Sequence, residues 1–308
     1  MKPRISVLLP VRNGASTLGR AMESVLAQSL DDFELIVIDD HSTDATAHVA
    51  ASFSSDRRVV VREAVGEGLV DALNQGLEEC AARFAARLDA DDWMMPNRLQ
   101  VQTAMLENDV ELSLVASPVI AYDGDGMLIG TRSSFVTDAA MKLILLRETG
   151  FAHSSVAYRV SDVTRLGGYL SSAFPAEDYE LWTRLALRGG KWAGVQESLT
   201  CIQVAPGSVS TSQGERQRSA AGGISAAARK SALCDYASRE TVRAEIAANP
   251  PLRGSPHLAR LQQAALWAAK GQLQRGRPLQ SVSAAMASAY SVGALLSATA
   301  LRRSRRSK

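Results

Sequence analysis

The amino-acid sequence predicts an α/β protein built on a doubly wound, mostly parallel β-sheet with helices on both faces. Two observations lead to this prediction. Continuous apolar runs, which are typical of strands buried on both faces, alternate with segments whose apolar residues recur at helical spacing. Polar clusters follow three of the first four runs. Alternating strands and helices indicate a parallel sheet, and such sheets bind ligands beyond the carboxyl ends of their strands.

Each predicted strand in the N-terminal part of the chain is a short apolar run. Four such runs occur, at residues 5–11, 33–39, 58–64 and 84–89. Helical segments separate them: Ser16 and Ser42 are placed to cap the first two helices, the third covers residues 69–82, and the fourth begins at Pro96. This order gives the first half of the sheet.

The second part of the chain continues the α/β pattern and then changes composition. We expect, in chain order, a strand at 113–122, a turn at 123–126, a helix at 137–147, an extended segment at 151–159 and a helix at 176–190. From about residue 213 the sequence is rich in Ala, Ser, Arg and Gln, which predicts an Ala-rich helical region with a basic tail over 213–308.

The net charge of +2 over 308 residues is too small to indicate a nucleic-acid partner, and we expect none. The charge is unevenly distributed, however. Five positive charges lie within the last seven residues, at Arg302, Arg303, Arg305, Arg306 and Lys308. The remainder of the chain is therefore slightly acidic.

The cysteines and the N-terminus favour a cytoplasmic protein. Cys80, Cys201 and Cys234 are scattered without C-x-x-C spacing, so they indicate neither a disulfide framework nor a zinc site. The first apolar run, at residues 5–11, is short and carries no small-residue cleavage site after it, so it reads as a strand and not as a signal peptide. We therefore expect a protein that is not exported.

The fourth strand ends in the stretch "ARLDADDW", with three carboxylates at Asp89, Asp91 and Asp92. A D-x-D pair at a strand end suits Mg²⁺ or Mn²⁺, which are held by one or two carboxylates together with substrate phosphates. The alternative is a set of acids at the start of the helix that begins at Pro96, where they interact favourably with the helix dipole. Both interpretations stay open for this stretch alone.

The other strand ends restrict the ligand. Neither a G-x-G-x-x-G fingerprint nor a G-x-x-x-x-G-K-[ST] phosphate loop occurs, so a dinucleotide site and a P-loop are not indicated. Asp39 and Asp40 end the second strand, where an acid can meet a ribose hydroxyl or a base N–H. Acids at two strand ends, with a metal site, describe a pocket for a nucleoside diphosphate.

Four blocks of the sequence together resemble glycosyltransferase family 2, whose members have the GT-A fold. They are "SVLLPVRNGASTLGRAMESVLAQSLDDFELIVIDDHSTDAT", "ALNQGL", "ARLDADDWMMPNRL" and "GGYLSSAFPAEDYELWTRLALRGGK". The similarity covers roughly residues 4–210 in motif order and spacing. It implies a GT-A catalytic domain over 1–212, with a nucleotide-sugar half at about 1–122 and an acceptor half at about 123–212.

The resemblance implies a role for each matching residue. On the donor side, Pro10, Val11 and Asn13 would line the nucleotide pocket, Asp40 would meet the base, and Asp39 would support that turn.

Among the three acids of "DADD", Asp89 would contact the ribose or a metal-bound water. Asp91 would be the direct ligand of Mn²⁺ or Mg²⁺, with Asp92 as a second ligand or a residue behind it.

On the acceptor side, the "AED" block would supply the catalytic base, Asp178, with Glu177 as its neighbour. The competing interpretation of these two acids is again a helix start. His153 matches a common acceptor-side position, although a histidine satisfied within the core is an equal alternative. Trp93, beside the carboxylates, is the tryptophan best placed to stack on a sugar; Trp182 and Trp192 are more typical of packing.

The implied reaction is an inverting transfer of a hexosyl-type unit from a nucleotide-sugar, such as a UDP-sugar, to a saccharide or lipid-linked saccharide acceptor. Asp178 would take the acceptor hydroxyl proton, so that no covalent intermediate is needed. Two alternatives remain: a sugar nucleotidyltransferase, and a non-catalytic nucleotide-sugar-binding protein.

The chain departs from the family pattern before "PGS". Members often have an Arg and a His there, and the His can complete the metal site, whereas this chain has Gln203 and Ala205. The departure puts the strength of metal dependence in question.

The C-terminal sequence suggests a membrane contact. Residues 279–301 carry no charge, but five serines, a Gln and a Thr make them too polar to be expected to span a bilayer. Either they form an Ala-rich helix packed on the catalytic domain, or they lie on an anionic inner membrane surface that the basic residues 302–308 bind.

Overall fold

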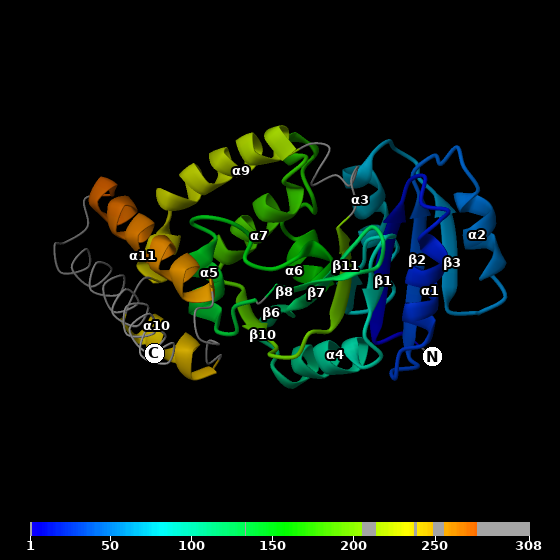
Figure 1. Cartoon of the computed structure of the whole chain (residues 1–308), viewed down its shortest axis with the longest axis horizontal. Helices are drawn as coiled ribbons and strands as arrows, with labels where there is room; N and C mark the ends of the chain where they lie inside the picture. The colour runs from blue at the N-terminus through cyan, green and yellow to red at the C-terminus, as the bar shows by residue number, and fades with distance from the viewer. Residues whose placement is uncertain (1, 133, 205–213, 237–238, 249–255, 276–308) are drawn as a thin grey trace, which may run out of the picture.

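The structure is a computed structural model that describes residues 2–132, 134–204, 214–236, 239–248 and 256–275. A seven-stranded sheet runs through its centre in the order β10-β6-β9-β4-β1-β2-β3 (Figure 1). Only β9 runs antiparallel to its neighbours, so the predicted doubly wound, mostly parallel sheet is confirmed. Its strands are β1 (Ile5–Val11), β2 (Phe33–Asp39), β3 (Val59–Glu63), β4 (Phe84–Arg87), β6 (Leu112–Ala116), β9 (Val156–Arg159) and β10 (Lys191–Gly194).

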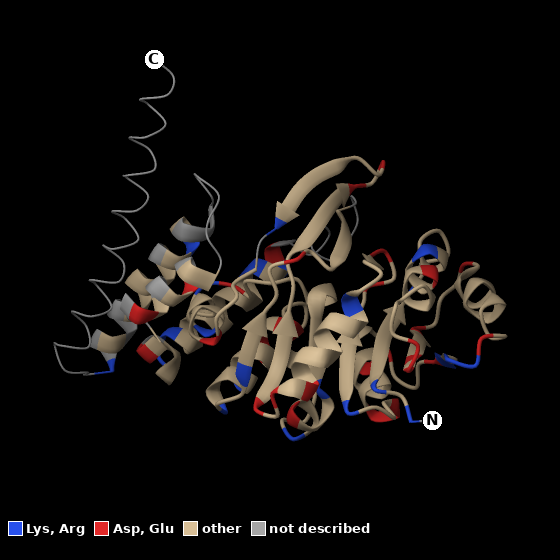
Figure 2. Ribbon diagram, turned by 90° about the horizontal axis from the view of Figure 1, so that it is seen from below, with Lys and Arg blue, Asp and Glu red and all other residues tan. Residues whose placement is uncertain are grey.

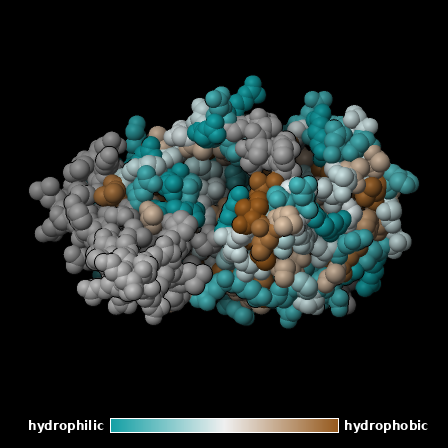
Figure 3. Space-filling model, in the orientation of Figure 1, coloured by the Kyte–Doolittle hydropathy of each residue, from teal (hydrophilic) through white to brown (hydrophobic). Residues whose placement is uncertain are grey.

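A smaller sheet has the order β5-β11-β7-β8. It stands over the edge at which strands of the large sheet end, and its hairpin projects outward (Figure 2). Its strands are β5 (Trp93–Met94), β7 (Val119–Asp123), β8 (Leu128–Arg132) and β11 (Thr200–Val204). The tip of the β7–β8 hairpin exposes Met127, Leu128 and Ile129, and apolar surface is visible over the region of this sheet (Figure 3).

The prediction of one strand over 113–122 is wrong. β6 ends at Ala116 in the large sheet, and β7 begins at Val119 in the small one. Pro118 lies between them, and a proline has no N–H to donate to a strand ladder, so the chain can change sheets here. The extended segment predicted at 151–159 contains a short 3-10 helix, η1 (His153–Ser155), followed by β9.

Alternation along β1 supplies two hydrophobic cores. Ile5, Val7 and Leu9 point to the face covered by α1 (Leu18–Leu26), α2 (Thr46–Ser52) and α4 (Arg98–Asn108). Leu8 points to the opposite face, which is covered by α3 (Leu69–Glu79), α5 (Asp138–Ile144) and α7 (Glu177–Leu187). Side chains two residues apart on a strand share a face, so one apolar run can serve both cores. Helices therefore cover both faces, as predicted.

The C-terminal helices pack on the α5 side. They are α9 (Gly214–Arg229), the 3-10 helix η3 (Ala232–Tyr236), α10 (Arg239–Ala248) and α11 (Pro256–Gln274). Ala228, Leu233 and Leu261 are buried in the same core as Met141 of α5. No helix within the described residues is both long and apolar enough to cross a bilayer. The tail at 279–308 lies outside the described residues.

Both predicted serine caps are wrong. α1 begins at Leu18, whose N–H donates to the carbonyl of Gly14, and Ser16 makes no cap. α2 begins only at Thr46, because the Ser42 hydroxyl instead accepts a hydrogen bond from the N–H of Asn13. The fourth helix likewise begins two residues after Pro96, at Arg98. The remaining short helices are α6 (Val160–Thr164) and η2 (Ser171–Ala173).

Candidate active site

The acidic loop joins β4 of the large sheet to β5 of the small one. β4 ends at Arg87 in the middle of the sheet, between β1 and β9. The N–H of Asp92 donates to the carbonyl of Asp89 (3.1 Å), so the chain turns sharply and enters β5 at Trp93. Asp89, Asp91 and Asp92 therefore lie together beyond the carboxyl end of β4.

Asp89 is held by charged and neutral donors. The Arg87 guanidinium, which is only 1% exposed, donates to one carboxylate oxygen at 2.5 Å. The Ser154 hydroxyl donates to the other oxygen, also at 2.5 Å. Partial burial acts to raise the pKa of Asp89, but Arg87, His153 and Ser154 together hold it below its usual value. Asp89 is thus a fixed negative charge.

The two following acids differ in their partners. Asp92 is buried, and its carboxylate accepts a hydrogen bond from the N–H of Gln203 (2.9 Å). Burial, with the charges of Asp89 and Asp91, raises the pKa of Asp92 well above its usual value. Asp91 is half-buried, and among the described residues its carboxylate accepts no hydrogen bond from another residue. Burial and the charge of Asp89 raise the pKa of Asp91 to about 6.

This donor set fits a hard divalent cation that is completed by substrate. Within the described residues, no group of three or more His, Cys, Asp or Glu side chains surrounds a common point, so there is no all-protein cage. Mg²⁺ and Mn²⁺ need only one or two carboxylates when phosphates and water supply the other ligands. The free carboxylate of Asp91 is the available ligand. Burial and the charge of Asp89 raise its pKa, and a bound cation would offset both effects.

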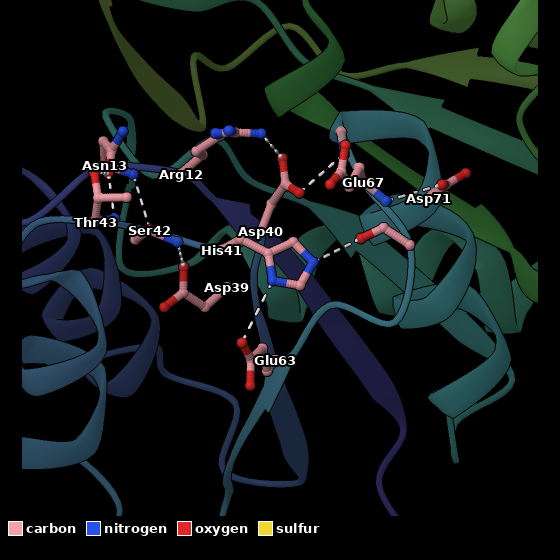
Figure 4. A network of polar contacts seen from close by, with 12 residues as sticks. Arg12, Asn13, Asp39, Asp40, His41, Ser42, Thr43, Glu63, Glu67 and Asp71 are labelled. Carbon is pink, nitrogen blue, oxygen red and sulfur yellow. Dashed lines mark hydrogen bonds and ion pairs between the residues drawn. The ribbon is translucent and has the colours of Figure 1, made fainter.

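Hydrogen bonds join the loops that follow β1 and β2 (Figure 4), and Gly14 of the first loop lies close to Ala90 of the acidic loop. The N–H of Asn13 donates to the Ser42 hydroxyl (2.9 Å), and the N–H of Thr43 donates to the Asn13 side-chain carbonyl (2.8 Å). Asp39 accepts from the N–H of Ser42 (3.1 Å). Asn13 and His41 both have φ of 52°, a left-handed conformation that these two residue types tolerate better than most. The two loops therefore form one rigid rim.

Asp40 ties this rim to α3. One oxygen of its buried carboxylate accepts from the N–H of Gly68 (2.9 Å), and the other lies 3.4 Å from the Arg12 guanidinium. Gly68 has φ of +92°, which a side chain would strain. Pro10 and Val11 are buried within β1. They could therefore contact a ligand only through backbone atoms or by forming the bottom of its pocket.

The first turn of α7 carries the second pair of acids. Glu177 is buried, and one of its carboxylate oxygens is buried without a hydrogen-bond partner. Burial and the charge of Asp178 raise the pKa of Glu177 to about 7. Asp178 is half-buried and accepts from the N–H of Tyr179 (2.7 Å); burial nevertheless raises the pKa of Asp178 to about 6. Carboxylates with such pKa values suit general-base chemistry near neutral pH.

The acidic loop and the α7 acids belong to one electrostatic site. The charge of Asp89 contributes to the raised pKa of both Glu177 and Asp178, and the charge of Arg87 opposes it in both. Residues 89 and 178 are distant in sequence but close enough to influence each other's protonation. Acids from two parts of the chain therefore lie near one another in the fold.

His153 is a hydrogen-bonded histidine in an aromatic cluster. Its Nε2 lies 3.0 Å from the Tyr169 hydroxyl, and its ring lies against Tyr169 and Trp182. Burial and the charge of Arg87 lower the pKa of His153 to about 3, so the ring is neutral at pH 7. Trp182 and Trp192 are fully buried packing residues.

Trp93 is the half-buried tryptophan of the acidic loop. Its ring centroid lies 5.0 Å from that of Tyr122, and the Arg20 guanidinium lies 3.9 Å over the ring. Arg20 thus covers one face of the tryptophan that was expected to stack on a sugar.

Sequence reasoning missed Arg20, Arg87 and Ser154. A signal existed for Arg87, because it interrupts an otherwise apolar strand run, and an unpaired arginine is rarely buried. Arg20 and Ser154 gave no signal, since their partners are 71 and 65 residues away along the chain.

Comparison with known proteins gives a matching family and related sequences, and these are described as glycosyltransferases. The family model described as glycosyl transferase family 2 matches residues 6–166. The putative glycosyltransferase EpsE of Bacillus subtilis is 31% identical over 64% of this chain and 72% of its own length. The Escherichia coli protein named UDP-Glc:alpha-D-GlcNAc-diphosphoundecaprenol beta-1,3-glucosyltransferase WfgD is 30% identical over 58% of this chain and 68% of its own.

Solved structures share the architecture. TarS 1-349 of S. aureus in complex with UDP-GlcNAc has a TM-score of 0.61 at 16% identity, covering 94% of this chain and 89% of that one. The mannosyltransferase PcManGT of Pyrobaculum calidifontis, in complex with GDP-Man and Mn²⁺, has a TM-score of 0.52 at 18% identity, covering 98% and 80%. At these identities the likeness is one of fold alone.

Proposed function

This chain belongs to glycosyltransferase family 2 and has the GT-A fold, and we propose that it is an inverting enzyme. Its donor is a nucleoside diphosphate sugar, most simply a UDP-sugar, and its acceptor is a hydroxyl of a saccharide or lipid-linked saccharide. The relative WfgD, named for a UDP-glucose donor and a diphosphoundecaprenol-linked acceptor, supports this choice. The product belongs to polysaccharide or glycoconjugate synthesis.

The observation that carries the proposal is the electrostatic link between the acidic loop and α7. Burial and the charge of Asp89 raise the pKa of Asp178. Ser154 binds Asp89, and the neighbouring His153 packs on Trp182 of α7, which supports placing the proposed donor site close to the proposed base. A base that removes a proton from an acceptor hydroxyl must lie beside the donor's anomeric carbon. The arrangement supports a single displacement, in which the acceptor oxygen attacks as Asp178 takes its proton.

On the donor side, Asn13, Asp39 and Asp40 form the rim in which we place the base and ribose. Asp89 is kept ionised and oriented by Arg87 and Ser154, so it can accept hydrogen bonds from ribose hydroxyls or bound water without rearranging. Preorganised acceptors of this kind cost nothing to orient when the substrate arrives.

Asp91, backed by Asp92, is the residue that we propose to hold Mn²⁺ or Mg²⁺. Such an ion, when bound, neutralises the charge of the departing diphosphate. Asp92 fixes the loop through its hydrogen bond from Gln203 and so determines where the Asp91 carboxylate lies. The position of Ala205, where family members often have a metal-binding His, lies outside the described residues. The side chain of alanine offers no ligand, so we expect moderate metal affinity.

We also propose that the basic tail brings the enzyme to an anionic membrane surface. The support is the run of cationic residues at 302–308, each worth about 1 kcal/mol near such a surface, and the lipid-linked acceptor named for WfgD.

The direct test is a donor panel of UDP-, GDP- and dTDP-sugars, with release of the nucleoside diphosphate measured with and without Mn²⁺. A glycosyltransferase releases a nucleoside diphosphate, whereas a sugar nucleotidyltransferase would exchange the nucleotide with pyrophosphate. A non-catalytic protein would bind a donor and release nothing.

A further inference from the structure

Arg20 reaches from α1 to the acidic loop and the small sheet. Its Nη2 donates to the backbone carbonyl of Asp91 (3.1 Å) and to the side-chain carbonyl of Gln203 (2.5 Å). Its guanidinium lies 3.9 Å over the ring of Trp93, which itself packs on Tyr122. Contacts from three residues therefore hold a side chain that would otherwise be free to rotate.

The guanidinium of Arg20 keeps donors that no other described residue uses. Within the described residues Arg20 makes no salt bridge, and its Nη1 and Nε donate to no other residue. Arg20 is an exposed residue, so a ligand in solvent can reach it. A cation fixed in place with unused donors is prepared to bind an anion.

The surroundings specify which anion. Arg20 donates to the backbone of Asp91, the residue whose carboxylate is free to hold a divalent cation. With Asp89 and Asp92 nearby, a diphosphate entering here would be repelled unless positive charge accompanies it. Guanidinium is well suited to phosphate oxygens.

We propose that Arg20 binds the diphosphate of the nucleotide donor, with Gln203 as its positioning residue. The inference rests on the proposed function. It assigns to this chain a positive charge of its own beside Asp91, in addition to the proposed divalent cation. Gln203 occupies the sequence block in which family members often carry metal-site residues. In this chain it orients a guanidinium instead.

The competing role for Arg20 is purely structural: the side chain would hold the acidic loop in place without contacting the ligand. The two roles differ in what they predict for ligands with one phosphate and with two. A residue that binds the diphosphate contributes more to the affinity for a diphosphate than to that for a monophosphate. A residue that only maintains the shape of the site affects both affinities alike.

The test is calorimetric binding of UDP, GDP and dTDP and of the corresponding monophosphates, in Mn²⁺ and in chelator. For the pair that binds the wild type, Arg20→Gln is expected to weaken the diphosphate by roughly 10-fold or more, about 1.4 kcal/mol, and the monophosphate by less than about twofold. Gln203→Leu is expected to cause a smaller loss in the same direction. Arg57→Gln is the matched control. Arg57 is an exposed cation that precedes β3, an edge strand of the large sheet, and it lies outside the proposed site.

Three outcomes separate the hypotheses. Unchanged diphosphate binding in Arg20→Gln, or equal losses for both ligands, would overturn the role of Arg20 while leaving the proposed function intact. A wild-type protein that binds none of the diphosphates would overturn the proposed function and this inference with it. Thermal melting of each variant verifies that the binding change is not a loss of folding.

Discussion

The N–H of Gln203 in β11 donates a 2.9 Å hydrogen bond to the carboxylate of Asp92, which is only 5% exposed. This bond fastens the acidic loop of the large sheet to the small sheet. It also keeps a carboxylate buried close to Asp89 and Asp91, which raises its pKa well above the usual value. The loop is thus positioned at a cost in stability, which a cation bound there would offset.

Replacing Asp92 by Asn should stabilise the protein in chelator at pH 8. A folded-state pKa above the unfolded value means that the folded protein loses stability as pH rises from about 4 through that raised pKa. Asn is neutral and retains an oxygen for the N–H of Gln203. We expect a higher Tm than the wild type at pH 8 and a difference that shrinks towards pH 4.

Asp92→Ala is the comparison, because it removes both the charge and the hydrogen-bond acceptor. Its Tm should lie below that of Asp92→Asn. A Tm of Asp92→Asn that falls below the wild type at every pH would contradict the repulsion inferred in the loop.

Asp91→Ala should abolish transfer and remove the Mn²⁺-dependent part of nucleoside diphosphate binding. Even changes to residues behind a metal ligand typically cost about 10–100-fold in metal affinity, and the loss of the free carboxylate itself should exceed that. Calorimetry with and without Mn²⁺ measures the effect. Asp31→Ala, an exposed acid before β2, should behave as the wild type. Wild-type turnover of Asp91→Ala in saturating Mn²⁺ would rule out the metal assignment.

The rate should depend on pH through the acids of α7. A general base works only when unprotonated, and burial raises the pKa of Asp178 to about 6 and that of Glu177 to about 7. We therefore expect kcat/KM to fall as pH drops, with a midpoint between about 6 and 7. An acid limb with its midpoint near 4, the ordinary range of aspartate, would contradict this.

Deletion of residues 302–308 should abolish salt-sensitive binding to anionic vesicles. The five positive charges in this stretch supply the attraction, and salt screens it. Co-sedimentation with phosphatidylglycerol vesicles at low and moderate salt measures the effect, with phosphatidylcholine vesicles as the control. Equal binding to the neutral vesicles would show that the tail is not an electrostatic anchor.

The sequence predicts the large sheet well because its signals are local. β1 and β2 are continuous apolar runs, and their observed bounds, Ile5–Val11 and Phe33–Asp39, match the predicted ones. The small sheet was not predicted, since β5 has two residues and β8 is mostly exposed, so neither carries an apolar pattern. Caps failed for a related reason: the Ser42 hydroxyl bonds to Asn13, 29 residues away, and not to its own helix.

The residues of the candidate site also differ in whether local sequence signals point to them. Its acids became candidates because Asp89, Asp91 and Asp178 stand in short motifs that resemble those of the family, although each group alone could also have been a helix start. Two residues that influence their charge state could not be identified in this way. Ser154 and Arg20 contact the acidic loop from 65 and 71 residues away, and only the assembled fold brings them there.

The most direct test of the account is a single-turnover measurement with Asp178→Asn. Pre-bound labelled donor is mixed with acceptor, and transferred sugar and bound donor are measured separately. We expect donor affinity close to the wild type and a transfer rate lower by about 10²–10⁴-fold, the usual contribution of a general base. Glu177→Gln, which changes the neighbouring acid in the same way, should transfer faster than Asp178→Asn. Near-normal transfer by Asp178→Asn, or loss of donor binding without loss of transfer rate at saturation, would contradict the central claim.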